Sequence, residues 1–127
     1  MAIEIVDQAI GKDCLLTLQS LSEFYVAVSR KRIIRAADAA APVNDWMATF
    51  SCVAASAGAV KTALAISLAG RASYWDALLL VTAAEAGCRH ILTEDLANGS
   101  MLAGVSIRNP FDPGGGLTAQ TRRLLGL

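Results

Sequence analysis

Residues 73–95 read SYWDALLLVTAAEAGCRHILTED and join a helix to a strand. Ser73 and the acid three places later, Asp76, form the capping-box pattern that is typical of a helix start. The apolar run that follows predicts a helix, and Gly87 is a residue at which helices commonly end. Residues 90–93, His90-Ile91-Leu92-Thr93, predict a short strand. This stretch therefore predicts a helix that leads directly into a strand.

The chain before residue 73 repeats this alternation. Residues 3–10 predict a short helix, and the apolar stretch 14–18, which follows a turn at 11–13, predicts a buried strand of a parallel sheet. Ser20 with Glu23 three places later is a second capping box. We therefore expect a helix to begin at that point, directly after the buried strand.

Residues 42–69 allow two interpretations. One is a helix that opens just after Pro42 and ends near Phe50, followed by a strand at 51–54 and a second helix at 56–69. The other is one continuous helix, because apolar residues keep a helical period through the whole stretch. We favour the break, partly because of the family resemblance described below.

The last third of the chain predicts a polar loop at 94–99, a strand at 105–108, a flexible Gly-rich joint at 112–116 and a small basic-apolar helix at 117–127. Alternating helices and strands are typical of an α/β fold, in which right-handed crossovers connect the strands of a parallel sheet. We expect residues 1–111 to form one domain and residues 112–127 to form the joint and a C-terminal tail.

The composition limits the possible locations and partners. The chain has 127 residues, of which 54% are hydrophobic, yet no apolar run approaches the roughly 20 residues that a membrane helix needs. No basic region followed by an apolar stretch marks the N-terminus for secretion, so we expect a soluble, cytoplasmic protein. The formal net charge is +0, so any attraction to nucleic acid must come from a local patch.

Three acids occupy corresponding positions in the predicted fold. Glu23 and Asp76 each fall in the predicted first turn of a helix, and Asp95 follows a strand. In an open parallel sheet such positions lie at the carboxyl edge, where ligands bind. Carboxylates that converge there repel one another unless a cation lies between them, and Mg²⁺ or Mn²⁺ suits such ligands. Taken singly, the first two are equally consistent with helix capping, and the third with an ordinary loop residue.

Three segments of the chain resemble successive landmarks of the PIN-domain family. These segments are Leu21-Ser22-Glu23-Phe24-Tyr25, Ser73-Tyr74-Trp75-Asp76-Ala77-Leu78, and Leu92-Thr93-Glu94-Asp95-Leu96 followed by Asn109-Pro110-Phe111. They come in the family's order, at plausible spacing, and the resemblance covers residues 3–111. The chain is similar to the VapC-like toxins of bacterial toxin-antitoxin pairs.

The resemblance implies a PIN-like, Rossmann-like parallel sheet with flanking helices and the strand order 3-2-1-4-5. It implies a metal-dependent endoribonuclease in which Glu23, Asp76 and Asp95 match three of the four acids that hold Mg²⁺. Expected partners are RNA, in single-stranded form, a second copy of the chain and, where the gene is paired, a cognate antitoxin. No membrane partner is expected.

One landmark of the family is missing. PIN domains begin with an apolar strand that ends in an acid, and this strand is the central one of the sheet. Asp7 is not a good match, because about 30 residues should separate the first acid from Glu23 and only sixteen positions do. We therefore expect a fold truncated at the N-terminus, without the central first strand and without the fourth acid.

The missing strand should leave two strand edges without partners. Strands 14–18 and 90–93 would each carry unpaired backbone groups along a buried edge, which costs free energy. We expect either a rearranged or domain-swapped dimer, in which another chain satisfies those edges, or helices that close over them.

Three functional hypotheses remain open. The first is a Mg²⁺- or Mn²⁺-dependent ribonuclease whose activity is weakened or lost because one acid is missing. The second is an inactive PIN-fold interaction protein that dimerises or binds an antitoxin without cleaving RNA, which the high apolar content favours. The third is a generic phosphate-handling α/β enzyme, and the lack of a Gly-rich loop between a strand and a helix argues against it.

Further candidate residues lie beside the acids. Arg30, Lys31, Arg32 and Arg35 follow the Glu23 helix and could contact an RNA backbone, although cations are also favoured at a helix end for structural reasons. Arg108, Arg122 and Arg123 allow the same two interpretations. Thr93 could orient a water beside the acids or simply pair at the end of its strand.

Overall fold

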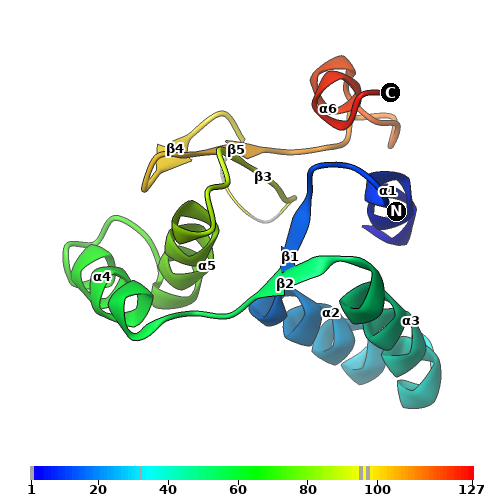
Figure 1. Ribbon diagram of the computed structural model, residues 1–127, viewed down its shortest axis with the longest axis horizontal. Helices are drawn as coiled ribbons and strands as arrows, with labels where there is room; N and C mark the ends of the chain where they lie inside the picture. The colour runs from blue at the N-terminus through cyan, green and yellow to red at the C-terminus, as the bar shows by residue number, and fades with distance from the viewer. Residues whose placement is uncertain (1, 32, 95, 97) are drawn as a thin grey trace. The chain divides into compact units, whose positions relative to one another are not determined.

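Helices and short strands alternate along the chain, as the sequence predicts (Figure 1). The computed structural model describes residues 2–31, 33–94, 96 and 98–127. The protein is a mixed α/β protein, and its contacts divide it into two units. Unit 1 comprises the N-terminal segment up to Asp13 together with Ala55–Leu127, and unit 2 is Cys14–Ala54.

Unit 2 is built from two parallel strands and two helices. Its elements are β1 (Leu15–Thr17), α2 (Leu18–Arg30), α3 (Ala36–Thr49) and β2 (Ser51–Val53). β1 and β2 pair in parallel, with Leu16 opposite Cys52. The helices pack through Phe24 and the buried Trp46, whose ring centroids are 5.1 Å apart in an edge-to-face arrangement.

The capping box predicted at Ser20 and Glu23 is wrong. α2 begins at Leu18, without a loop after β1, and its N-cap is Thr17, whose hydroxyl accepts a hydrogen bond from the Ser20 backbone N–H at 3.1 Å. A threonine at the end of the strand serves equally well as a cap, so the helix starts earlier than the Ser-x-x-Glu spacing predicts. Glu23 therefore lies in the second turn, beyond the first-turn position that we expected.

The helix expected just after Pro42 begins earlier. α3 starts at Ala36, so Pro42 lies inside it, and the Ala-rich sequence at its start outweighs the proline. The predicted break near Phe50 is confirmed, because β2 separates α3 from the next helix and the continuous helix does not form.

Unit 1 contains the remaining helices and a three-stranded sheet. Its elements are α1 (Ala2–Ala9), α4 (Ala57–Leu68), α5 (Tyr74–Glu85), β3 (His90–Leu92), β4 (Met101–Leu102), β5 (Val105–Arg108) and α6 (Ala119–Leu125). The strand order is β3-β5-β4, with β3 parallel and β4 antiparallel to β5.

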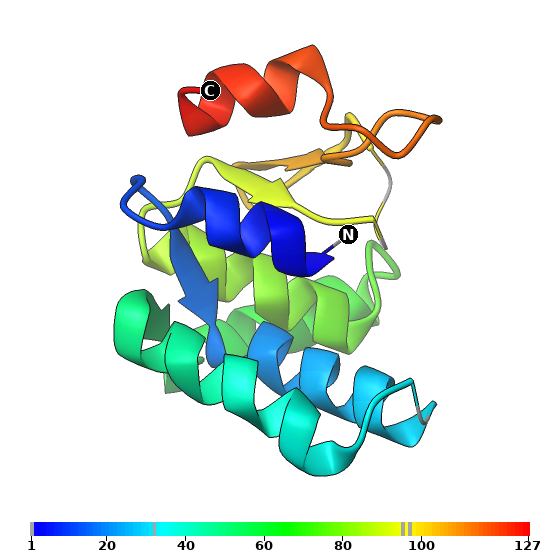
Figure 2. The same cartoon turned by 90° about the vertical axis from the view of Figure 1, so that its right-hand side faces the viewer.

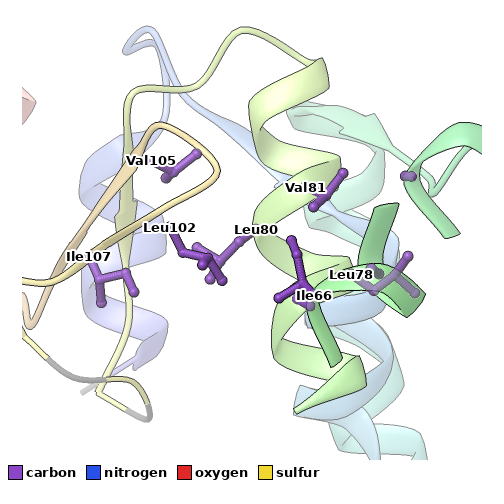
Figure 3. Packing of buried hydrophobic residues seen from close by; sticks show 10 residues of the cluster. Ile66, Leu78, Leu80, Val81, Leu102, Val105 and Ile107 are labelled. Atoms are coloured by element: carbon purple, nitrogen blue, oxygen red, sulfur yellow. The ribbon is translucent and has the colours of Figure 1, made fainter. Parts of the chain in front are cut away.

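The core of unit 1 forms around α5. Every residue of α5 from Ala77 to Ala83 is buried, because one side of the helix packs on α4 and the other on the sheet. Figure 3 shows Leu80 on the side of α5 that faces the sheet residues, and Val81 on the other side, with Ile66 of α4. Leu102, Val105 and Ile107 are the sheet's contribution to this cluster.

The ends of α5 follow the sequence prediction. Ser73 is the N-cap, and its hydroxyl accepts a hydrogen bond from the backbone N–H of Asp76 at 3.2 Å. Gly87 follows the last turn with φ 87°, a left-handed conformation that glycine adopts without steric cost. The predicted helix-to-strand order of residues 73–95 is thus confirmed for the described part of that stretch.

The hairpin of β4 and β5 was not predicted. Ala103 and Gly104 connect the two strands, with φ values of 53° and 79°. Positive φ at both central residues is typical of a type I′ turn. Alanine is an unusual first residue for such a turn, so the sequence carries no strong hairpin signal here.

The Gly-rich segment after Phe111 forms a closed turn. Phe111 and Leu117 form an isolated antiparallel bridge, and Asp112 closes the turn between them. Its backbone N–H donates to the Gly116 carbonyl at 2.7 Å, while its carboxylate accepts from the Gly116 N–H at 3.0 Å. α6, which follows, is the helix expected within residues 117–127.

Candidate functional site

Asp76 lies at the start of the most deeply buried helix of unit 1. It is the third residue of α5, half-buried, directly before the fully buried Ala77. The packing of Ala77 to Ala83 fixes the helix axis, and the Ser73 cap fixes its first turn. A carboxylate in this first turn is also stabilised by the positive end of the helix dipole.

The carboxyl end of β3 lies on the same side of unit 1 as the start of α5. Figure 2 shows α5 beginning, and β3 ending, on the right-hand side of that view. Thr93 follows β3, and its backbone N–H donates to the carbonyl of Arg108 at 3.0 Å. Asp76 and Thr93 therefore share one end of unit 1. The exposed Glu94 follows Thr93, and Asp95 lies outside the described residues.

Asn98 and Gly99, which come after the acidic residues that follow β3, form hydrogen bonds with the end of β5 and with Asn109. The side-chain oxygen Oδ1 of Asn98 accepts a hydrogen bond from the Asn109 backbone N–H at 2.8 Å. The Gly99 N–H donates to the carbonyl of Ile107, also at 2.8 Å. Thr93, Asn98 and Gly99 are thus each hydrogen-bonded to the last residues of β5 or to Asn109, which follows it.

The backbone of Arg108 is hydrogen-bonded to Thr93, at the start of this loop. It is the last residue of β5 and stands opposite Leu92 in the parallel register. Its side-chain Nε is buried and has no hydrogen-bond partner among the residues that the structure describes. In the sequence, its positive charge made it a candidate RNA contact together with Arg122 and Arg123, and nothing there indicated that its Nε is buried.

Glu23 lies in unit 2, on α2. Its side chain is exposed, and its Oε1 accepts a hydrogen bond from Gln19 Nε2 at 3.1 Å. Glu23 and Arg30 line a shallow hollow of about 330 Å³ together with Ser22, Val26 and Ala27. Glu23 and Asp76 thus belong to different units.

An apolar hollow adjoins this one on unit 2. It has a volume of about 410 Å³ and lies between α2 and α3. Ser22 and Val26 line both hollows, while Leu18 and Met47 contribute exposed apolar surface to the larger one.

The predicted basic stretch lies around the end of α2. Arg30 is the last residue of the helix and Lys31 is its C-cap, and both are exposed. Arg35 is exposed as well, and its Nε forms an ion pair with Asp38 Oδ2 at 3.0 Å. Arg32 lies outside the described residues. Cations at the end of a helix interact favourably with its dipole, so the structural interpretation of Arg30 and Lys31 remains open beside the functional one.

The metal site expected from the three acids includes a residue that the structure does not describe. Across the described parts of the chain, no three or more His, Cys, Asp or Glu side chains are grouped so as to hold a metal ion. Asp95 is not among those residues. The donor chemistry of Glu23 and Asp76 fits Mg²⁺ or Mn²⁺, because both are carboxylates, one on an exposed and one on a half-buried residue.

Comparisons with protein-family models, with curated proteins and with solved structures found no match to this chain. In the described part of the chain, the helices are too short or too polar to cross a membrane.

Proposed function

We propose that this chain is a PIN-like protein that binds single-stranded RNA and cleaves it with a divalent metal ion held by Glu23, Asp76 and Asp95. The observation that carries the proposal is the pairing of its parallel strands. β1 pairs with β2, and β3 pairs with β5. Both pairings are compatible with the order 3-2-1-4-5 if β1 and β2 correspond to its second and third strands, and β3 and β5 to its fourth and fifth.

The same pairing supports a fold that lacks the central first strand. Among the described residues, β1 has β2 as its one strand neighbour, and β3 has β5 as its one neighbour. In the family order, the first strand would pair with the strands that β1 and β3 represent. The second edge of β1 and of β3 would then need a partner. Either another chain supplies it in a rearranged or domain-swapped dimer, or helices close over these edges.

The carboxylates supply the chemistry of the proposed site. Asp76 is held by a capped helix start, and Asp95 follows the strand whose end lies on the same side of unit 1. Glu23 comes from α2, the helix that follows β1. A bound Mg²⁺ or Mn²⁺ would polarise the scissile phosphate and activate a water for in-line attack. With three acids in place of four, we expect weak cleavage.

The test is cleavage of a mixed single-stranded RNA pool in Mn²⁺ or Mg²⁺. Asp76→Asn removes the charge of a proposed ligand with little change in shape, and we expect it to abolish cleavage. Asp7→Asn is the matched control, because Asp7 is an exposed acid on α1 that the proposal leaves without a role. Metal-dependent cleavage that survives in Asp76→Asn would contradict the proposed site.

A second candidate function is binding without catalysis. The apolar hollow of unit 2, with exposed Leu18, Val26 and Met47, favours an interaction protein that dimerises or binds a cognate antitoxin. A chain that forms a stable dimer but shows no metal-dependent cleavage at any metal concentration would support this alternative. Dimerisation with cleavage would support the nuclease.

A further inference from the structure

The outward face of α4 is apolar and exposed. On its inner face Ala59, Ala63 and Ile66 are buried, and α5 lies between α4 and the sheet. The outward face includes Ala57, Lys61, Leu64, Ala65 and Leu68, which are all exposed. Leu64 is 49% exposed and Leu68 is 88% exposed. A helix that is apolar all round is normally buried, so this face calls for a partner.

The residues of this face suit contact with another helix. Ala57, Lys61, Leu64 and Leu68 follow one another at intervals of four, three and four, the spacing of helices that pack side by side. Ala57 and Ala65 are small, and small residues beside large ones let two helices interdigitate. Lys61 is the one charged residue of the five. The face therefore fits a second apolar helix.

Charges at the two ends of α4 restrict which helix that can be. Glu85 lies beside its start, because its carboxylate accepts from the N-cap Ser56 and its Oε1 would lie 3.6 Å from a Cβ atom at Gly58. Arg71 follows the other end, where its backbone N–H donates to the carbonyl of Ile66 at 3.2 Å. Glu85 and Arg71 are both exposed. The apolar face thus lies between an acid and a base.

We propose that α4 packs against α4 of a second copy of this chain, in antiparallel orientation, with the two-fold axis at Leu64. Arg71 lies seven positions after Leu64 and Ala57 seven positions before it, so Arg71 of each copy comes opposite Ala57 of the other. This places each Arg71 near Gly58 and Glu85 of the other copy. A parallel pair would instead bring the two Glu85 carboxylates together, and like charges repel.

The same register suits the cation of the face. Lys61 of each copy comes beside Leu68 of the other, at the last turn of α4, which has no basic residue of its own. The C-terminal end of a helix attracts a cation, and the aliphatic stem of a lysine can cover an exposed leucine. The two Leu64 side chains meet at the axis. Such an isologous contact closes as a dimer.

The length of α4 limits the strength of this dimer. The helix has 12 residues, which corresponds to about 18 Å. A contact of this length is smaller than the interface of a permanent dimer, so we expect a dissociation constant in the micromolar range. The surface lies wholly within unit 1 and is independent of the proposed function.

Sedimentation equilibrium of the full chain over a range of concentrations measures the dimer. We expect Leu68→Lys to weaken it about tenfold or more, because this change puts a second cation beside Lys61 of the other copy. Met47→Lys is the matched control, since Met47 is an exposed apolar residue of the hollow on unit 2. We expect it to leave the dimer unchanged. Leu68 is so exposed that its replacement should not disturb the fold.

Charge reversal tests the antiparallel orientation. Arg71→Glu and Glu85→Lys each replace two attractive pairs of the dimer by two repulsive ones, so we expect each variant alone to dimerise about tenfold more weakly. A mixture of the two restores both pairs in the mixed dimer, and we expect it to associate about as tightly as the wild type. Thermal melts check that Glu85→Lys folds without its contact to Ser56, and Leu68→Lys decides if it does not.

Three results would overturn the proposal. One is a wild-type chain that stays monomeric up to millimolar concentration. Another is a dimer that Met47→Lys disrupts and Leu68→Lys leaves intact, because the contact would then belong to unit 2. The third is a mixture of folded Arg71→Glu and Glu85→Lys that associates no better than either variant alone, since the two copies would then not pair in antiparallel orientation.

Discussion

Ser56 is the residue whose hydrogen bonds connect two helices of unit 1. Its hydroxyl accepts from the Ala59 backbone N–H at 3.0 Å as the N-cap of α4. The same hydroxyl donates to both carboxylate oxygens of Glu85, at 3.1 and 2.7 Å, and Glu85 is the last residue of α5. One side chain therefore caps one helix and fixes the end of another.

We expect Ser56→Ala to lower the free energy of unfolding by about 1–2 kcal/mol, because it removes a helix cap and the contact to Glu85 together. Urea unfolding measures this difference. Ser22→Ala is a suitable comparison, since Ser22 only donates to the Leu18 carbonyl within an exposed helix face, and alanine favours helix. A Ser56→Ala midpoint equal to that of Ser22→Ala would show that neither the cap nor the contact to Glu85 stabilises the fold.

Cys88 provides a pH-dependent prediction. Burial raises the pKa of its thiol above the ordinary value, and the negative charge of Asp13 adds to the rise. The pH profile of Cys88 alkylation, resolved by mass spectrometry, should therefore have a midpoint above that of the urea-denatured chain. Asp13→Asn should lower this midpoint only in part, because burial is the larger cause.

The same shift affects stability with a definite sign. A thiol with a higher pKa in the folded state stabilises the fold below its unfolded pKa, and this contribution is lost as the pH rises through the folded pKa. A folded-state midpoint at or below the denatured one would contradict the half-buried position of Cys88.

At the scale of elements, the turn of the β4–β5 hairpin predicts opposite effects on stability for substitutions at its two central residues. Ala103 adopts a positive φ of 53°, which costs an alanine more than an asparagine or a glycine. Ala103→Asn creates the Asn-Gly pair that type I′ turns prefer, and we expect it to raise the free energy of unfolding by about 0.5–1 kcal/mol. Gly104→Ala should lower it, because φ at Gly104 is 79°. Chemical denaturation of both variants checks the pair, and the same sign for both would contradict the turn type.

The sequence predicted the elements better than their starts. The helix of residues 74–85, its cap Ser73 and its stop Gly87 carry strong local signals, and each is confirmed. The start of α2 was missed because two residues, Thr17 and Ser20, are both good caps, and only the end of β1 decides between them.

The hairpin and the site illustrate what a sequence does not contain. Ala103-Gly104 lacks the usual residues of a tight turn, so β4 had no local signal. The burial of Arg108 Nε depends on the packing around the end of β5, and residue type alone does not reveal it. In contrast, the placement of Asp76 in a first helical turn followed directly from the Ser73 spacing.

At the scale of the whole molecule, the two units should differ in stability. In unit 1, α5 alone buries every residue from Ala77 to Ala83. In unit 2, the buried helix residues are Leu21 on α2 and Ala39 and Trp46 on α3. Because local stability follows buried apolar contacts, we expect backbone amides of α2 and α3 to exchange with solvent faster than those of α5. Native-state hydrogen exchange measures this order, and equal protection in both units would show that they unfold as one.

The central proposal is that Glu23, Asp76 and Asp95 bind one metal ion. Paramagnetic Mn²⁺ tests it most directly, since it broadens the NMR signals of amides close to where it binds. We predict that substoichiometric Mn²⁺ broadens the amides around Glu23 and those around Asp76 and Asp95 together, and that Asp76→Asn weakens both effects. Broadening confined to one unit, or spread over exposed acids such as Asp7 and Asp45, would contradict the claim.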